Sequence, residues 1–95
     1  MKLIVSRAAV ADLVRLRAFL VDKNEITARR AVQVLEEAMQ SLLHFPDRGR
    51  LAGGFGARDL IVPFGRSSYL VRYIHRVEAN EIVVLRPWHG RELRE

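Results

Sequence analysis

The chain has 95 residues, of which 49% are hydrophobic and 28% are charged, a composition typical of a folded globular protein. It contains no cysteine, which excludes disulfides and cysteine-ligated zinc, and its apolar runs fall far short of the roughly 18 residues that span a bilayer. The formal net charge is +5, and Lys2 and Lys23 are the only lysines among 16 basic residues.

The basic charge therefore comes almost entirely from arginine. Guanidinium is planar, always charged and able to bind carboxylate or phosphate through two parallel hydrogen bonds, so we expect an anionic partner, either nucleic acid or an acidic protein segment. A genome rich in G·C is an alternative source of the same bias. We expect one domain over residues 1–95, in the cytoplasm, without a signal peptide or a membrane segment.

The first elements in chain order are a short strand and a helix. Residues 2–5 are rich in β-branched side chains and predict a strand, and Ser6 follows as a helix N-cap. Helical spacing of apolar residues predicts a helix over residues 7–22, with Asp12 mostly on the solvated side. The apolar stripe, which Arg17 interrupts, comprises Val10, Leu13, Val14, Leu20 and Val21.

A second helix is expected to begin at Thr27, its N-cap, with Ile26 as a hydrophobic staple. Its apolar stripe runs from Ala31 to Leu42, and the turn-forming segment from Phe45 to Arg50 ends it. The two helices are joined by a short polar link and predict an antiparallel hairpin that packs on a sheet.

Three strand-like runs follow, over residues 58–64, 69–77 and 81–88, with linkers short enough for hairpin turns. The expected fold class is α+β in the order β-α-α-β-β-β, a mainly antiparallel sheet with the helical hairpin on one face.

Alternation along the last two strands separates their two faces. The face that carries Arg72, Arg76 and Arg86 is expected to be open to solvent, because burying an unpaired guanidinium costs several kcal/mol. Four apolar residues are expected on this face among the arginines: Leu70, Ile74, Val84 and Trp88. Arginine interleaved with apolar and aromatic side chains indicates a recognition surface, so Arg58, Arg66, Arg72, Arg76, Arg86 and Trp88 are the candidate target-binding residues. Ordinary solubilising charge is the alternative, and we expect charge reversal at Arg72 or Arg86 to leave the fold nearly intact.

Residues with catalytic chemistry are few. His89, close to Arg91, is a candidate for moving a proton next to a stabilised phosphate, and a structural role for this histidine is the alternative. His44 and His75 have no partner at metal-ligand spacing, and phosphate-binding and dinucleotide motifs are absent. We expect neither a metal nor a cofactor.

The chain resembles the RelE/ParE superfamily of toxins from bacterial type II toxin–antitoxin modules. The resemblance covers nearly the whole chain and combines the element order with three motifs. These are the loop Phe45-Pro46-x-x-Gly49-Arg50, the hairpin from Val62-Pro63-Phe64-Gly65 to Tyr69-x-Val71-x-Tyr73, and the segment Ile82-Val83-Val84-Leu85-Arg86-Pro87-Trp88-His89-Gly90-Arg91.

The resemblance implies one of two activities. RelE-type members cleave mRNA in the ribosomal A site with clustered basic residues and a tyrosine, histidine or glutamate near the chain end, whereas ParE-type members poison DNA gyrase. By this resemblance, Ile61 and Pro63 stand where RelE-type members carry paired lysines. Leu70 stands where they carry the arginine that follows the hairpin tyrosine. Arg91 alone keeps a match, and no tyrosine follows it. These departures favour a ParE-like gyrase inhibitor.

The alternatives are a RelE-like endoribonuclease and a non-toxic binding or regulatory module. The resemblance further implies a neutralising antitoxin of the ParD kind, with a ribbon-helix-helix fold and a C-terminal segment that folds on binding, in a toxin–antitoxin hetero-oligomer. We expect that segment to wrap the apolar groove between the helical hairpin and the sheet. The candidate antitoxin-binding residues are Val10, Leu13, Arg17, Leu20, Leu70 and Ile74.

Overall fold

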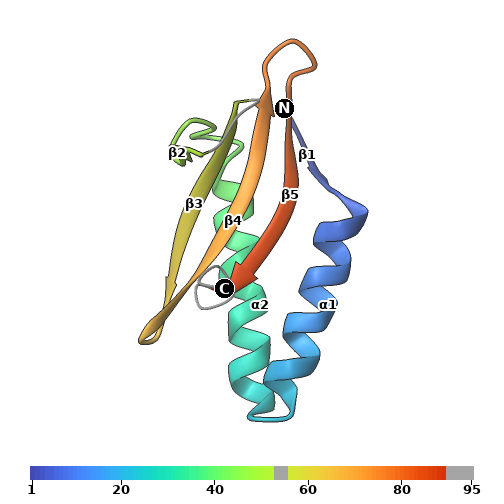
Figure 1. Cartoon of the computed structure of the whole chain (residues 1–95), viewed down its shortest axis with the longest axis vertical. Helices are drawn as coiled ribbons and strands as arrows, with labels where there is room; N and C mark the ends of the chain where they lie inside the picture. Colours follow the sequence, from blue (N-terminus) through green and yellow to red (C-terminus); the bar gives the residue numbers. More distant parts are fainter. Residues whose placement is uncertain (53–55, 90–95) are drawn as a thin grey trace.

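The computed structural model describes residues 1–52 and 56–89, with side chains as far as residue 87, and it follows the predicted order of elements (Figure 1). The elements are β1 (Lys2–Val5), α1 (Arg7–Val21), α2 (Glu25–Ser41), β2 (Arg50–Leu51), β3 (Ala57–Phe64), β4 (Ser67–Arg76) and β5 (Glu81–His89). The two-residue strand β2 is not predicted by the sequence. In the described part of the chain, no helix is long and apolar enough to cross a membrane.

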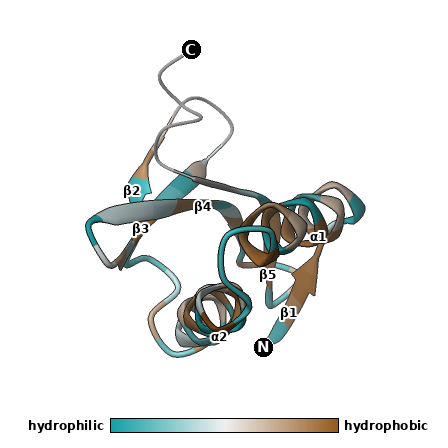
Figure 2. Cartoon of the chain, turned by 90° about the horizontal axis from the view of Figure 1, so that it is seen from below, coloured by the Kyte–Doolittle hydropathy of each residue, from teal (hydrophilic) through white to brown (hydrophobic). Residues whose placement is uncertain are grey.

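The strands form one five-stranded sheet in the order β1-β5-β4-β3-β2. β1 runs parallel to β5, and the other neighbours are antiparallel. Figure 2 shows α2 beneath the sheet and α1 beside β5, and the packing of α1 on β5 and of α2 on β3 agrees with this view. The predicted α+β fold with a helical hairpin is confirmed.

Ser6 places the start of α1 against the sheet. Its hydroxyl oxygen accepts a hydrogen bond from the Ala9 N–H at 3.1 Å, which caps the helix as predicted. The same hydroxyl donates to the Leu85 carbonyl on β5 at 2.9 Å, and the Ser6 N–H donates to the Val84 carbonyl at 3.0 Å. One residue therefore both begins the helix and fixes its end beside β5.

The predicted start of the second helix is wrong by a few residues. Asn24, not Thr27, is the N-cap, and its side-chain oxygen accepts from the Thr27 N–H at 3.1 Å. An asparagine in extended conformation satisfies an early helical N–H as well as a threonine does, so the helix begins one turn earlier. The link between the helices shrinks to residues 22–24.

The core lies between the helices and one face of the sheet. Alternate residues of β4 point into it, and Tyr69, Val71 and Tyr73 are buried as the predicted parity requires. The remaining large members are Leu16, Leu35, Met39, Leu42, Leu60, Val62, Ile82 and Val84. Of the predicted apolar stripe of α1, only Leu13 and Leu20 pack against this core, whereas Val10, Val14 and Val21 are exposed.

A β-bulge in β5 makes the predicted face of Val84 wrong. Arg72 is opposite Arg86, but the next residue of β4, Tyr73, is opposite Val84, so Leu85 is an extra residue between them. The extra residue reverses the alternation of β5. Val84, expected on the open face with Arg86, is instead fully buried beneath the helices together with Ile82.

The outer edge of β3 is paired only at its beginning. The Ala52 N–H donates to the Ala57 carbonyl at 2.9 Å, so the backbone groups of Asp59, Ile61 and Pro63 also point to this edge. Proline has no N–H, so Pro63 leaves no unpaired donor at this edge and is tolerated in the strand. It also offers no donor for pairing with a further strand.

Candidate functional site

The face of the sheet that points away from the helices carries Arg72, Arg76 and Arg86 of the residues predicted to bind a target. A row of charged residues crosses it, because Arg50 is opposite Asp59, Asp59 is opposite Arg72, and Arg72 is opposite Arg86. Arg72 donates to both carboxylate oxygens of Asp59, from Nε at 2.8 Å and from Nη2 at 2.9 Å. This hydrogen bond to Asp59 raises the pKa of the Arg72 guanidinium above its ordinary value.

Arg86 turns from the end of this row toward α1. Its Nε and Nη2 donate to the two carboxylate oxygens of Asp12 at 2.9 and 3.0 Å, and Arg15 approaches the same carboxylate at 3.6 Å. The Asp12 side chain is only 6% exposed, so its predicted position on the solvated side is wrong. The Arg86 hydrogen bonds lower the pKa of the Asp12 carboxyl against the effect of burial, which raises it.

The other predicted target-binding arginines differ in their surroundings. Arg76 lies 3.4 Å from the Glu81 carboxylate. Arg58 is on the helix side of the sheet, where its Nη1 donates to the Gly49 and Asp47 carbonyls at 2.7 and 3.2 Å. Arg66 is exposed in the β3–β4 turn and makes no hydrogen bond or ion pair within residues 1–52 and 56–87. The open face is thus a set of ion pairs rather than a bare cationic platform.

The residues predicted to bind an antitoxin are Val10, Leu13, Arg17, Leu20, Leu70 and Ile74. The first four lie on α1, where Val10 and Arg17 are exposed and the two leucines pack, partly buried, against the core. The last two alternate with the buried residues of β4 and lie on the face of the sheet away from the helices. The structure therefore separates this set into two surfaces.

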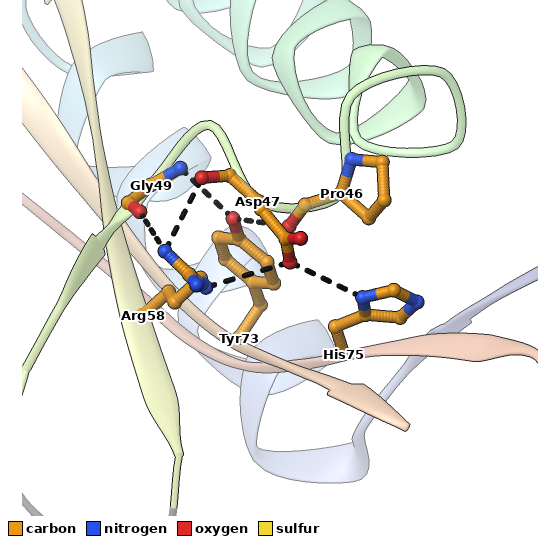
Figure 3. Close-up of polar contacts among 6 residues, drawn as sticks. All are labelled: Pro46, Asp47, Gly49, Arg58, Tyr73 and His75. Atoms are coloured by element: carbon orange, nitrogen blue, oxygen red, sulfur yellow. Dashed lines mark hydrogen bonds and ion pairs between the residues drawn. The ribbon is translucent and has the colours of Figure 1, made fainter. Parts of the chain in front are cut away.

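A polar cluster at the end of α2, missed at the sequence level, joins the following loop to the sheet (Figure 3). The Tyr73 hydroxyl donates to the Pro46 carbonyl at 2.7 Å and accepts from the Gly49 N–H at 3.0 Å. The Asp47 carboxylate lies 3.3 Å from His75 Nδ1 and 3.6 Å from Arg58 Nε. The available signal was the motif Phe45-Pro46-x-x-Gly49-Arg50 together with a polar end to the inward face of β4.

Gly49 is required where this loop crosses the sheet. A Cβ added at this residue would lie 2.8 Å from the Tyr73 ring and hydroxyl and 3.1 Å from the Asp59 carbonyl. A side chain would displace the tyrosine that holds the loop, so the glycine of the motif permits close packing.

Catalytic groups are scarce in the described part of the chain. Both tyrosines of the sequence are buried on the helix side, where desolvation raises the pKa of each hydroxyl. No group of three or more potential metal ligands occurs among the residues described. The side chains of Trp88 and His89 and all of Arg91 lie outside the described residues.

This fold, with its loop motif and hairpin in the same order, defines the class as toxins of the RelE/ParE superfamily from type II toxin–antitoxin systems. The family described as "ParE toxin of type II toxin-antitoxin system, parDE" matches residues 3–94, and the chain belongs to this family.

Similar proteins carry both names of the superfamily. The chain is 40% identical over 91 residues to "Toxin RelE1" of Caulobacter vibrioides, covering 96% of this chain and 95% of the relative. It is 31% identical over 83 residues to "Toxin RelE3" of the same organism, covering 87% of each. A solved structure described as "Chromosomal ParDE TA system from P. aeruginosa" superposes with a TM-score of 0.78 at 27% identity, over 94% of this chain and 95% of the other.

Proposed function

We propose that this toxin inhibits DNA gyrase and does not cleave mRNA on the ribosome. The observation that carries the proposal is the pairing of the sheet guanidiniums. Phosphodiester cleavage needs cations that stabilise the developing charge and a group that transfers the proton. On the open face, Arg72, Arg76 and Arg86 instead face carboxylates of the same chain.

The positions that differ from RelE support the same conclusion. Ile61 and Pro63 are exposed on the open face of β3, and Leu70 lies on the same face of β4, where RelE-type toxins are expected to present basic side chains. Neither tyrosine reaches this face. The match to the ParE family and the ParDE-type neighbour support the ParE branch of the superfamily. We propose that the toxin acts in the cytoplasm.

Ribosome-dependent mRNA cleavage is the second candidate, because the two relatives from Caulobacter vibrioides are named RelE toxins. Its catalytic residues would be His89 and Arg91. Two assays on the same purified toxin separate the candidates. We expect inhibited supercoiling by gyrase and intact transcripts in a toeprinting reaction on translating ribosomes. Unchanged supercoiling, with A-site cuts that vanish in His89→Ala, would replace the first candidate by the second.

We further propose that a cognate ParD-like antitoxin binds along α1. Val10, Val14 and Val21 are spaced four and seven residues apart, so they share one side of the helix, and all three are exposed with Arg17 among them. An exposed apolar stripe with a basic residue suits an acidic amphipathic segment that folds on binding. The two chains would form a hetero-oligomer.

The antitoxin surface is tested by Val14→Asp, which changes a side chain that is 64% exposed. We expect the affinity for the antitoxin encoded beside the toxin gene to fall about 30-fold, the effect of losing an interface hot spot. Val77→Asp, at another exposed valine, is the matched control. Equal antitoxin affinity in both variants would place the interface elsewhere.

A further inference from the structure

The segment His44–Leu51 at the end of α2, here called the corner loop, is exposed except at Pro46 and Gly49 and is held in place by hydrogen bonds to the sheet. Tyr73 and Arg58 bind its backbone at Pro46, Asp47 and Gly49. The Phe45 N–H also donates to the Ser41 carbonyl at the end of α2 at 3.0 Å, and within the segment the Arg48 N–H donates to the Phe45 carbonyl at 3.2 Å. A loop fixed before binding loses little conformational entropy when a partner docks.

This rigid loop presents large apolar side chains to solvent. Phe45 is 66% exposed and Leu51 is 71% exposed, although the loop between them is fastened to a buried tyrosine. A single exposed apolar side chain is ordinary, but an aromatic and an aliphatic residue on one rigid loop with neighbouring arginines have the composition of a protein interface.

The charge of the corner loop is positive. Arg48 and Arg50 are exposed, and the Arg48 guanidinium is held by a 2.7 Å hydrogen bond from Nη1 to the Ser41 hydroxyl. The carboxylate of Asp47 is balanced by Arg58 at 3.6 Å. Arg50 is opposite Asp59 on the open face of the sheet, whereas Leu51 is opposite Arg58 on the helix side, so Arg48 is the cation of the loop that accompanies its apolar residues. One cation with two exposed apolar side chains fits an acidic protein surface with an apolar pocket better than a nucleic acid, whose binding depends on many phosphate contacts.

The corner loop lies away from the proposed antitoxin surface. α1 packs on β5, next to the β1 edge of the sheet, whereas the corner loop leads into β2 at the opposite edge (Figure 1). A partner bound along α1 thus leaves the corner loop accessible at the other edge.

We propose that the corner loop is the surface with which the toxin contacts its target protein, with Phe45 and Leu51 as apolar anchors and Arg48 facing an acidic residue. This assignment rests on the proposed function in requiring a protein target, but it does not require that the target be gyrase.

The experiment compares Phe45→Ser and Arg48→Glu with Val77→Ser and Arg30→Glu, which alter exposed residues of the same types elsewhere. For each variant we measure growth arrest on induction, inhibition of supercoiling by purified gyrase, affinity for the antitoxin, and thermal stability. We expect the corner variants to need about 30-fold more toxin for half-maximal inhibition, with unchanged antitoxin affinity and stability, and the controls to match the wild-type toxin.

The outcomes separate the two proposals. If the corner variants inhibit gyrase and growth like the wild type, the assignment of the corner loop is overturned and the gyrase proposal stands. The same holds if these variants lose affinity for the antitoxin but still inhibit gyrase. A wild-type toxin that arrests growth without affecting gyrase, with arrest relieved by Phe45→Ser, supports the corner loop and rejects gyrase as its target. A wild-type toxin that neither arrests growth nor affects gyrase overturns both.

Discussion

The ion pair between Asp12 and Arg86 is expected to stabilise the fold measurably. It joins α1 to the bulged part of β5 through two short hydrogen bonds, and the carboxylate is 6% exposed whereas the guanidinium is 48% exposed. Removing one partner of a fully buried pair costs about 3–5 kcal/mol. Because Arg86 is half exposed and Arg15 remains 3.6 Å from the carboxylate, we expect Arg86→Ala to cost about 2 kcal/mol. For a chain of this length that lowers Tm by about 10 °C.

The pH dependence gives this prediction a second readout. The folded-state pKa of Asp12 lies below its ordinary value of 3.8, so its contribution to stability is present above that value and is lost as pH falls through the folded pKa. Asp12→Asn removes the ionised carboxylate at every pH. The difference in the free energy of unfolding between the wild type and Asp12→Asn should therefore be large at pH 7 and should shrink below about pH 4.

Urea denaturation followed by circular dichroism at pH 7 and pH 3 measures both effects. Arg29→Ala is the matched control, because Arg29 pairs with Glu25 on the exposed surface of α2, and we expect it to change stability by less than about 0.5 kcal/mol. The reasoning is refuted if Arg86→Ala costs no more than Arg29→Ala, or if the deficit of Asp12→Asn is the same at both pH values.

Three further substitutions test the elements that position the surfaces. Gly49→Ala should destabilise the fold by about 1–3 kcal/mol, because its Cβ would meet the Tyr73 ring at 2.8 Å, and a thermal melt equal to that of the wild type would contradict the close packing. Tyr73→Phe should destabilise the fold by about 1–3 kcal/mol by leaving the Pro46 carbonyl and the Gly49 N–H without their partner. Hydrogen exchange at the Gly49 N–H should then become faster, and an unchanged rate would contradict the role of the Tyr73 hydroxyl in holding the loop. Ser6→Ala should cost about 1 kcal/mol through loss of the α1 cap, and equal urea midpoints for variant and wild type would show that the cap is dispensable.

Much of the fold could be predicted because it depends on local patterns. The order of elements follows from apolar periodicity, from the cap at Ser6 and from the proline and glycine that end α2. The faces of β4 follow from strict alternation, which places the tyrosines inward and Arg72 outward. The motif around Gly49 marked the corner loop, although its contacts with Tyr73 could not be foreseen from spacing.

The remaining features depend on contacts between distant residues. The bulge at Leu85 exists only in the pairing of β5 with β4, so alternation along β5 alone misplaced Val84. The residues near Asp12 in the sequence indicate a solvated side chain, because the arginine that binds it is 74 residues away along the chain. The same pairs revise the expectation that charge reversal at Arg72 or Arg86 leaves the fold nearly intact, since a glutamate at either position would face a carboxylate.

The proposed action of the toxin on gyrase is tested most directly by the linear DNA that gyrase releases when a plasmid reaction is stopped with detergent. We predict that purified toxin increases this trapped, cleaved DNA in a dose-dependent manner and that an equimolar amount of antitoxin abolishes the increase. Plasmid that stays intact at excess toxin, while the same preparation cuts mRNA in the ribosomal A site, would contradict the proposal.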